Sequence, residues 1–188
     1  MQDGLKTLSA GLSRRHVVAG ALGALALPIA TPAFGRGIEA PATETDERFM
    51  RLALEEAALA DDPYYFGAVI VRDGEVLARG RNLWSQQQDP TAHGEMVAIR
   101  RFLAAHGLEK IKGTTLYTSG ESCPMCMGAI VWCGLGRVVY AASVEQLEKR
   151  IGQIMITSKA VAQAAPFITV EITGGVLATE ALALFEKK

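Results

Sequence analysis

The chain has 188 residues, of which 49% are hydrophobic, and its formal charge at pH 7 is −1. This length suits one domain with a sizeable core and is short for two. The near-neutral charge disfavours a large basic surface for nucleic acid, which requires clustered lysine and arginine.

Residues 1–35 have the pattern of an export signal. Arg14 and Arg15 precede an apolar run at residues 17–30, and no further charge occurs before Arg36. A basic start, a short apolar stretch and small residues are typical of a signal peptide, and paired arginines are typical of the bacterial twin-arginine route. We therefore expect a periplasmic or exported protein, or a cytoplasmic one if the signal is not used.

A membrane anchor and a core helix are the alternatives for this apolar run. Pro28 interrupts it, and it is shorter than the ~20 residues of a spanning helix. We expect the mature chain to have no membrane span. Without residues 1–35 it keeps 16 basic against 19 acidic side chains, which makes nucleic acid an unfavourable partner.

After a linker at residues 36–44, helical and strand patterns alternate through residues 45–188. Helices are expected at residues 45–60, 91–105 and 124–132. Strands are expected at residues 68–71, 76–78, 114–117 and 138–141. Such alternation predicts an α/β domain with a mixed sheet.

Two short motifs carry metal chemistry. His93 and Glu95 form a His-x-Glu, and Cys123 and Cys126 form a Cys-x-x-Cys. A catalytic zinc ion usually takes three protein ligands and keeps its fourth position for water. We expect His93, Cys123 and Cys126 to bind Zn²⁺ and Glu95 to carry protons.

Each motif alone has a simpler interpretation. A single His-x-Glu is most often a surface feature, and a Cys-x-x-Cys in an exported protein is also a thiol–disulfide motif. Their joint occurrence, each at the expected start of a helix, favours the zinc site. Cys133 is interpreted as a small buried apolar residue.

The residues around both motifs carry a wider likeness. It covers residues 49–142, and its blocks are residues 66–71, 82, 89–95, 116–119 and 123–130. With these blocks in this order, the chain resembles the cytidine/deoxycytidylate deaminase superfamily, and within it the guanine deaminase and tRNA adenosine deaminase branch. The resemblance implies a three-layer αβα fold with a mixed five-stranded sheet, and a zinc-dependent deaminase domain at residues 45–188. In this arrangement the remaining strand is expected at residues 168–172 and a closing helix at residues 180–187.

The resemblance also implies roles for single residues and for partners. Asn82 matches an asparagine that hydrogen-bonds the base or sugar, the backbone of Gly94 would face the pocket, and Phe66 would line its floor. Glu95 would pass protons to a ring nitrogen and to the departing ammonia. A small nucleobase substrate and a homodimer are implied as well.

Three functions remain open at this point. The first is a zinc-dependent hydrolytic deaminase of a purine base or related aminated heterocycle, guanine-like above all. The second is a tRNA-specific adenosine deaminase, and the third is a non-catalytic zinc-binding or thiol-redox protein on the same scaffold. Guanine deaminases carry an aspartate after the fourth strand, whereas this chain has no aspartate after Asp89.

Overall fold

The computed structural model describes residues 37–61 and 63–186. The predicted export signal at residues 1–35 lies outside these residues and stays a prediction. Within the described part of the chain, no helix is both long and apolar enough to cross a bilayer.

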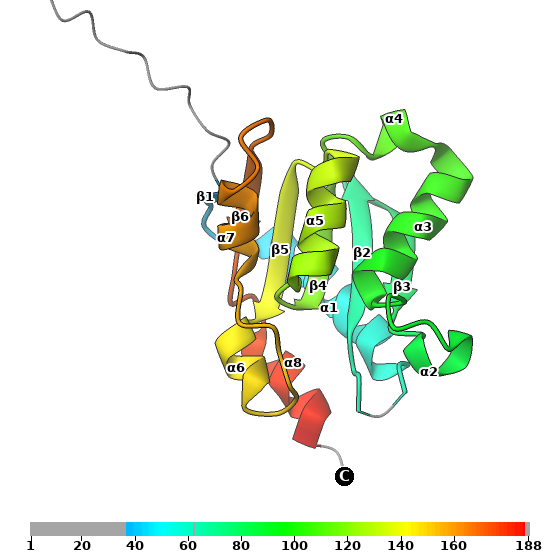
Figure 1. The fold of residues 1–188 in the computed structure, drawn as a ribbon, viewed down its shortest axis with the longest axis vertical. Helices are drawn as coiled ribbons and strands as arrows, with labels where there is room; N and C mark the ends of the chain where they lie inside the picture. The colour runs from blue at the N-terminus through cyan, green and yellow to red at the C-terminus, as the bar shows by residue number, and fades with distance from the viewer. Residues whose placement is uncertain (1–36, 62, 187–188) are drawn as a thin grey trace, which may run out of the picture. The chain divides into compact units, whose positions relative to one another are not determined.

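The described residues fold into one mixed sheet with helices on both faces (Figure 1). The strands are β1 (Gly37–Glu39), β2 (Gly67–Arg72), β3 (Glu75–Arg81), β4 (Thr115–Gly120), β5 (Arg137–Ala142) and β6 (Val170–Thr173). The helices are α1 (Glu44–Ala58), α2 (Trp84–Gln87), α3 (Gly94–His106), α4 (Leu108–Ile111), α5 (Pro124–Cys133), α6 (Val144–Glu148), α7 (Ser158–Gln163) and α8 (Ala178–Ala183), which a 3₁₀ turn (Leu184–Glu186) follows.

The strand order is β1-β6-β5-β4-β2-β3. β2 pairs antiparallel with β3 and β4, while β4, β5, β6 and β1 run parallel. The five predicted strands are therefore confirmed as β2–β6. The short β1, which pairs with β6, falls in the stretch that we predicted to be a linker and makes a sixth strand.

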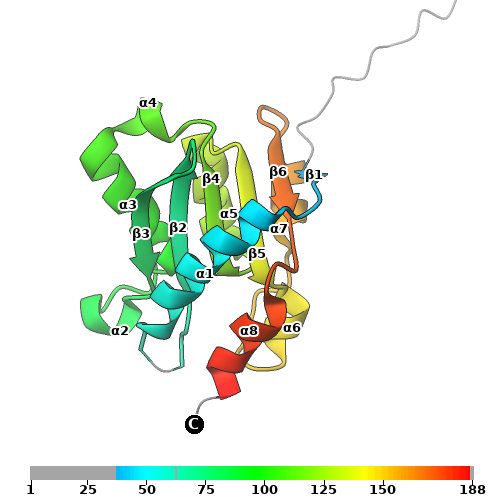
Figure 2. The ribbon, with the colours of Figure 1, turned by 180° about the vertical axis from the view of Figure 1, so that it is seen from behind.

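Alternating side chains place a hydrophobic core on each face of the sheet. Ile70 and Leu116 point to the face that α3, α5 and α7 cover, whereas Val69 and Tyr117 point to the face that α1 and α8 cover. Figures 1 and 2 show these two helical layers from opposite sides. The three-layer αβα arrangement is confirmed.

Candidate active site

Two helix N-termini meet beside the sheet. His93 is the N-cap residue of α3, and Glu95 lies in the first turn of that helix. Cys123 is the N-cap residue of α5, Pro124 begins the helix, and Cys126 lies one turn further on. Proline suits this place because the first helical N–H has no partner within the helix. Both motifs thus place their side chains at positive helix ends.

The three predicted zinc ligands lie together. Their ligand atoms are all within 4.8 Å of one another. His93 Nδ1 is 3.7 Å from Cys123 Sγ and 3.6 Å from Cys126 Sγ. A tetrahedral ion with Zn–S of about 2.3 Å and Zn–N of about 2.0 Å separates nitrogen from sulfur by about 3.5 Å. The side chains present therefore fit Zn²⁺ with a fourth position left for water.

The pKa values of the Cys123 and Cys126 thiols bear on metal binding as well. The pKa of Cys123 is lowered to about 4, first by a hydrogen bond from Cys126, and the neighbouring His93 adds to this effect against burial. The pKa of Cys126 is raised, because that same hydrogen bond and burial retain its proton. The thiolate is the form that binds a metal. Cys123 already favours this form, and Cys126 would release its proton on metal binding.

Glu95 is a buried carboxyl group at this cluster. Glu95 is only 5% exposed to solvent. Burial raises its pKa above the ordinary carboxyl value, against the attraction of His93. A carboxyl whose charged form is disfavoured can both accept a proton and release it again, which is what general acid–base catalysis requires.

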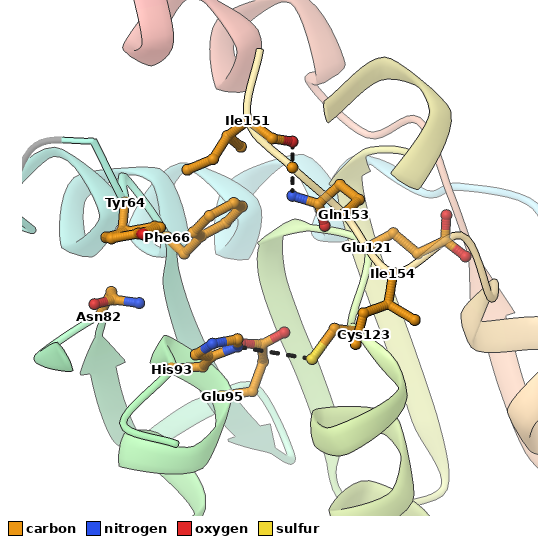
Figure 3. Close-up of a pocket in the computed structure, with 11 residues that line it drawn as sticks. Tyr64, Phe66, Asn82, His93, Glu95, Glu121, Cys123, Ile151, Gln153 and Ile154 are labelled. Carbon is orange, nitrogen blue, oxygen red and sulfur yellow. Dashed lines mark hydrogen bonds between the residues drawn. The ribbon is translucent and has the colours of Figure 1, made fainter. Parts of the chain in front are cut away.

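A cavity of about 160 Å³ opens above the cluster. Figure 3 shows His93, Glu95 and Cys123 on one side of it. The other lining residues are Tyr64, Phe66, Asn82, Glu121, Ile151, Gly152, Gln153 and Ile154. We call residues 149–157, which lie between α6 and α7, the roof segment. An apolar cavity of about 150 Å³ is large enough for benzene, so this space suits a small heterocycle.

Two of the three predicted substrate-binding residues line the cavity, and the third does not. Asn82 and Phe66 line the cavity, whereas Gly94 is buried and is not among the lining residues. A Cβ on Gly94 would lie 3.1 Å from the carbonyl oxygen of Phe66 and 3.1 Å from Cα of Gly67. The absence of a side chain lets α3 approach β2 closely.

Glu121 and the roof segment are the parts of the site that sequence reasoning missed. Glu121 is 5% exposed and directly follows β4, two residues before Cys123. An acid so close in sequence to a predicted metal ligand was the available signal. Neither Glu145 nor Glu148, which follow the fourth predicted strand, is among the residues that line the cavity.

Comparison with known proteins gives the family. Residues 43–142 match the model of the cytidine and deoxycytidylate deaminase zinc-binding region. The chain belongs to this family. The matched region contains His93, Cys123 and Cys126, which are the predicted zinc ligands, and Glu95.

Individual relatives come from two groups of this deaminase family. The tRNA-specific adenosine deaminase of Haemophilus influenzae is 37% identical over 143 residues, which are 73% of this chain and 79% of that protein. The guanine deaminase of Bacillus subtilis is 49% identical over 77 residues, 41% of this chain and 49% of that protein. A solved structure, NE0047 in complex with 2,6-diaminopurine, superimposes on this chain with a TM-score of 0.64 and 27% sequence identity. The match covers 76% of this chain and 80% of the NE0047 chain.

Several curated relatives are longer than the matched part. The chain spans between 8% and 63% of the length of four of them. The family is therefore shown by the matched domain, and the activity of the whole protein is a separate matter.

Proposed function

We propose that this deaminase-family chain is a zinc-dependent aminohydrolase that removes an exocyclic amine from a purine base or a related aminated heterocycle. One observation carries this function: the buried Glu95 carboxyl lies beside the His93, Cys123 and Cys126 ligand set, on one side of a small cavity. These are the parts that hydrolytic deamination requires.

In the reaction, water adds to the ring carbon that bears the amine, and ammonia leaves. Zinc, when bound, lowers the pKa of its water to near 7 and so makes a nucleophile available at neutral pH. Glu95 takes a proton from the water, delivers it to the ring nitrogen, and transfers the second proton to the departing amine. The products are the oxo heterocycle and ammonia, so every atom of the water is used.

A free base is supported by the size and polarity of the cavity. It is walled by Phe66, Ile151 and Ile154 together with amide groups, which suits an uncharged planar ring. The guanine deaminase relative is 49% identical over its matched residues. Guanine and similar bases are accordingly the first substrates to test.

The second candidate is a tRNA-specific adenosine deaminase. It is favoured by the Haemophilus influenzae relative, which matches over 79% of its length. It is disfavoured by the charge of the chain after residue 35, because that part carries more acidic than basic side chains.

The third candidate is a zinc-binding or thiol-redox protein without turnover. Cys123 and Cys126 are free cysteines in the structure. A disulfide between them in the purified protein, with no bound metal, would support this function instead.

Ammonia release separates the three candidates. Purified protein with a measured zinc content would be given guanine, adenine, cytosine, their nucleosides and a tRNA transcript. We expect turnover of a free base. Turnover of the transcript alone would identify the tRNA deaminase. No ammonia release from any substrate, together with a disulfide between Cys123 and Cys126, would identify the redox protein.

We further propose that residues 1–35 direct twin-arginine export. The support is the pattern of paired arginines before an apolar run. Cell fractionation of the full chain, with an Arg14→Lys/Arg15→Lys variant, tests this. We expect the wild type in the periplasmic fraction and the variant in the cytoplasmic fraction. Equal amounts of the two proteins in the cytoplasmic fraction would contradict export.

We also propose that the protein acts as a homodimer, in line with the family resemblance. Sedimentation equilibrium of the purified protein tests this proposal. A mass of one chain across the micromolar range would contradict it.

A further inference from the structure

The cavity wall comes from two parts of the chain. His93, Glu95, Asn82 and the other early lining residues lie inside the region that matches the family, residues 43–142. Ile151, Gly152, Gln153 and Ile154 lie beyond it, in the roof segment. The chemical groups thus belong to the shared domain, and the roof belongs to the part of the chain outside that match.

Buried hydrogen bonds to Glu121 fix the chain on both sides of the roof segment. Glu121 Oε2 accepts a hydrogen bond of 3.0 Å from the backbone N–H of Val144, which begins α6. Glu121 Oε1 accepts two hydrogen bonds of 2.8 Å from the N–H and hydroxyl of Ser158, which begins α7. Hydrogen bonds to a carboxylate are stronger than neutral ones, so the roof has a defined position over the cavity.

Two amide side chains present complementary groups to the cavity. Gln153 Nε2 donates to the carbonyl oxygen of Ile151 at 3.4 Å, and no described residue donates to Gln153 Oε1. Asn82 Oδ1 accepts from the N–H of Trp84 at 2.9 Å, which leaves Nδ2 as a donor. The carbonyl acceptor beside Gln153 and the N–H donor beside Asn82 fix which end of each amide is nitrogen. Figure 3 shows the nitrogen of Asn82 on the cavity side and Gln153 across the cavity from Glu95.

On the basis of the deaminase function above, we propose that Gln153 is the specificity-determining residue of this cavity. Gln153 Oε1 accepts a hydrogen bond from the ring N–H of a lactam-type heterocycle such as a 6-oxopurine. Asn82 donates to an acceptor on the same ring, and Ile151 and Ile154 contact its face. A 6-oxopurine offers a ring N–H beside a carbonyl, whereas the adenine ring of a nucleoside offers no ring N–H.

Two bases without an exocyclic amine test this inference independently of turnover. Hypoxanthine carries the lactam N–H and carbonyl, and purine has the same ring frame without them. The dissociation constants of both would be measured by calorimetry on the zinc-loaded protein. The variants are Gln153→Met, which keeps the length of the side chain, and the exposed Gln163→Met of α7 as the matched control.

We expect Gln153→Met to weaken hypoxanthine binding roughly tenfold, the value of one lost hydrogen bond, and to change purine binding less than about twofold. Gln163→Met leaves both constants unchanged. Equal weakening of both bases in Gln153→Met, no weakening, or no binding of hypoxanthine to the wild type would overturn the role of Gln153.

Ammonia release from the panel of bases and nucleosides, measured on the same preparations, separates this inference from the proposed function. If hypoxanthine binding depends on Gln153 but the wild type releases no ammonia, the deaminase function fails and the role of Gln153 stands. If ammonia is released and the two binding constants keep their ratio in Gln153→Met, the role of Gln153 fails and the deaminase function stands.

Discussion

The carboxylate of Glu121 accepts 2.8 Å hydrogen bonds from both the backbone N–H and the hydroxyl of Ser158, 37 residues further along the chain. Both residues are buried. Together with the N–H of Val144, these contacts connect the loop of the zinc ligands to the roof of the cavity. Glu121, two residues before Cys123, thus accepts hydrogen bonds from the first residues of two helices, α6 and α7.

Replacing Glu121 by glutamine should loosen the roof without removing zinc. One carboxylate oxygen becomes an NH₂ group that faces a backbone donor, so we expect a loss of about 1–3 kcal/mol in the free energy of unfolding. KM for the base should rise while the zinc content stays at that of the wild type. Denaturant unfolding and steady-state kinetics measure these effects, with the exposed Glu180→Gln as the control. An unchanged KM would show that the roof does not depend on Glu121.

Asp46 should make the stability of the fold depend on acid pH. Burial raises the pKa of Asp46, but hydrogen bonds from Arg137, Thr43 and Tyr117 outweigh it, and the pKa is lowered. Because the folded-state pKa is below the unfolded value of about 3.9, this stabilisation is complete above that pH and is lost as the pH falls through the folded-state pKa.

The Asp46→Asn variant tests this dependence. Arg137 Nη1 is 2.7 Å from Asp46 Oδ1, and the two side chains are 19% and 1% exposed. We expect a loss of about 2–3 kcal/mol at pH 7, less than for a fully buried pair because Arg137 retains some exposure. Unfolding between pH 2 and pH 7 should show a flatter acid limb than the wild type. The exposed Asp73→Asn should keep the wild-type profile, and a steep acid limb in Asp46→Asn would refute the assignment.

Gly80 should be intolerant of alanine because α3 crosses β3 at this residue. A Cβ there would overlap the backbone of Gly94 and Ala98, so α3 and its Glu95 must shift. We expect about 1–3 kcal/mol of destabilisation, and a fall in kcat.

The matched substitution for this test is Gly128→Ala. A Cβ on Gly128 meets nothing within 4 Å, and the residue lies inside α5. Alanine is the better helix former, so we expect stabilisation of about 0.5–1 kcal/mol. Thermal unfolding of both variants measures the contrast. Equal effects of the two substitutions would contradict the close contact between α3 and β3.

Zinc binding should distinguish Cys123 from Cys133. Cys123 contributes a sulfur to the ligand cluster, and Cys133 is outside it. We expect elemental analysis to find one zinc per chain in the wild type and in Cys133→Ala, and a value near zero in Cys123→Ala. A wild-type zinc content in Cys123→Ala would mean that the cluster is not the metal site.

The cluster of His93, Cys123 and Cys126 and the core strands could be predicted from the sequence, because their signals are local. His93 and Glu95, like Cys123 and Cys126, are close in sequence at the start of a helix, and each strand has its own apolar run. The short helices α2, α4, α6 and α7 have four to six residues each. That is too short for a helical period to show.

The roof could not be predicted because its position depends on contacts between distant residues. Glu121 meets Ser158 only after β5 and α6 have returned the chain to the cluster, and no local pattern marks that pairing. The packing role of Gly94 likewise depends on the approach of Phe66 and Gly67, at the start of β2. The sequence therefore predicted which residues cluster at the cavity, and the structure was needed to find what encloses them.

The most direct measurement is ammonia release and zinc content of the wild type and Glu95→Gln, side by side, with guanine as substrate. Glu95 is proposed to carry protons, and it lies outside the three-residue cluster of His93, Cys123 and Cys126. We therefore expect one zinc per chain in both proteins and a loss of at least about 10²-fold in kcat in the variant. Turnover in Glu95→Gln close to that of the wild type, at equal zinc content, would contradict the assignment of Glu95 as the proton carrier.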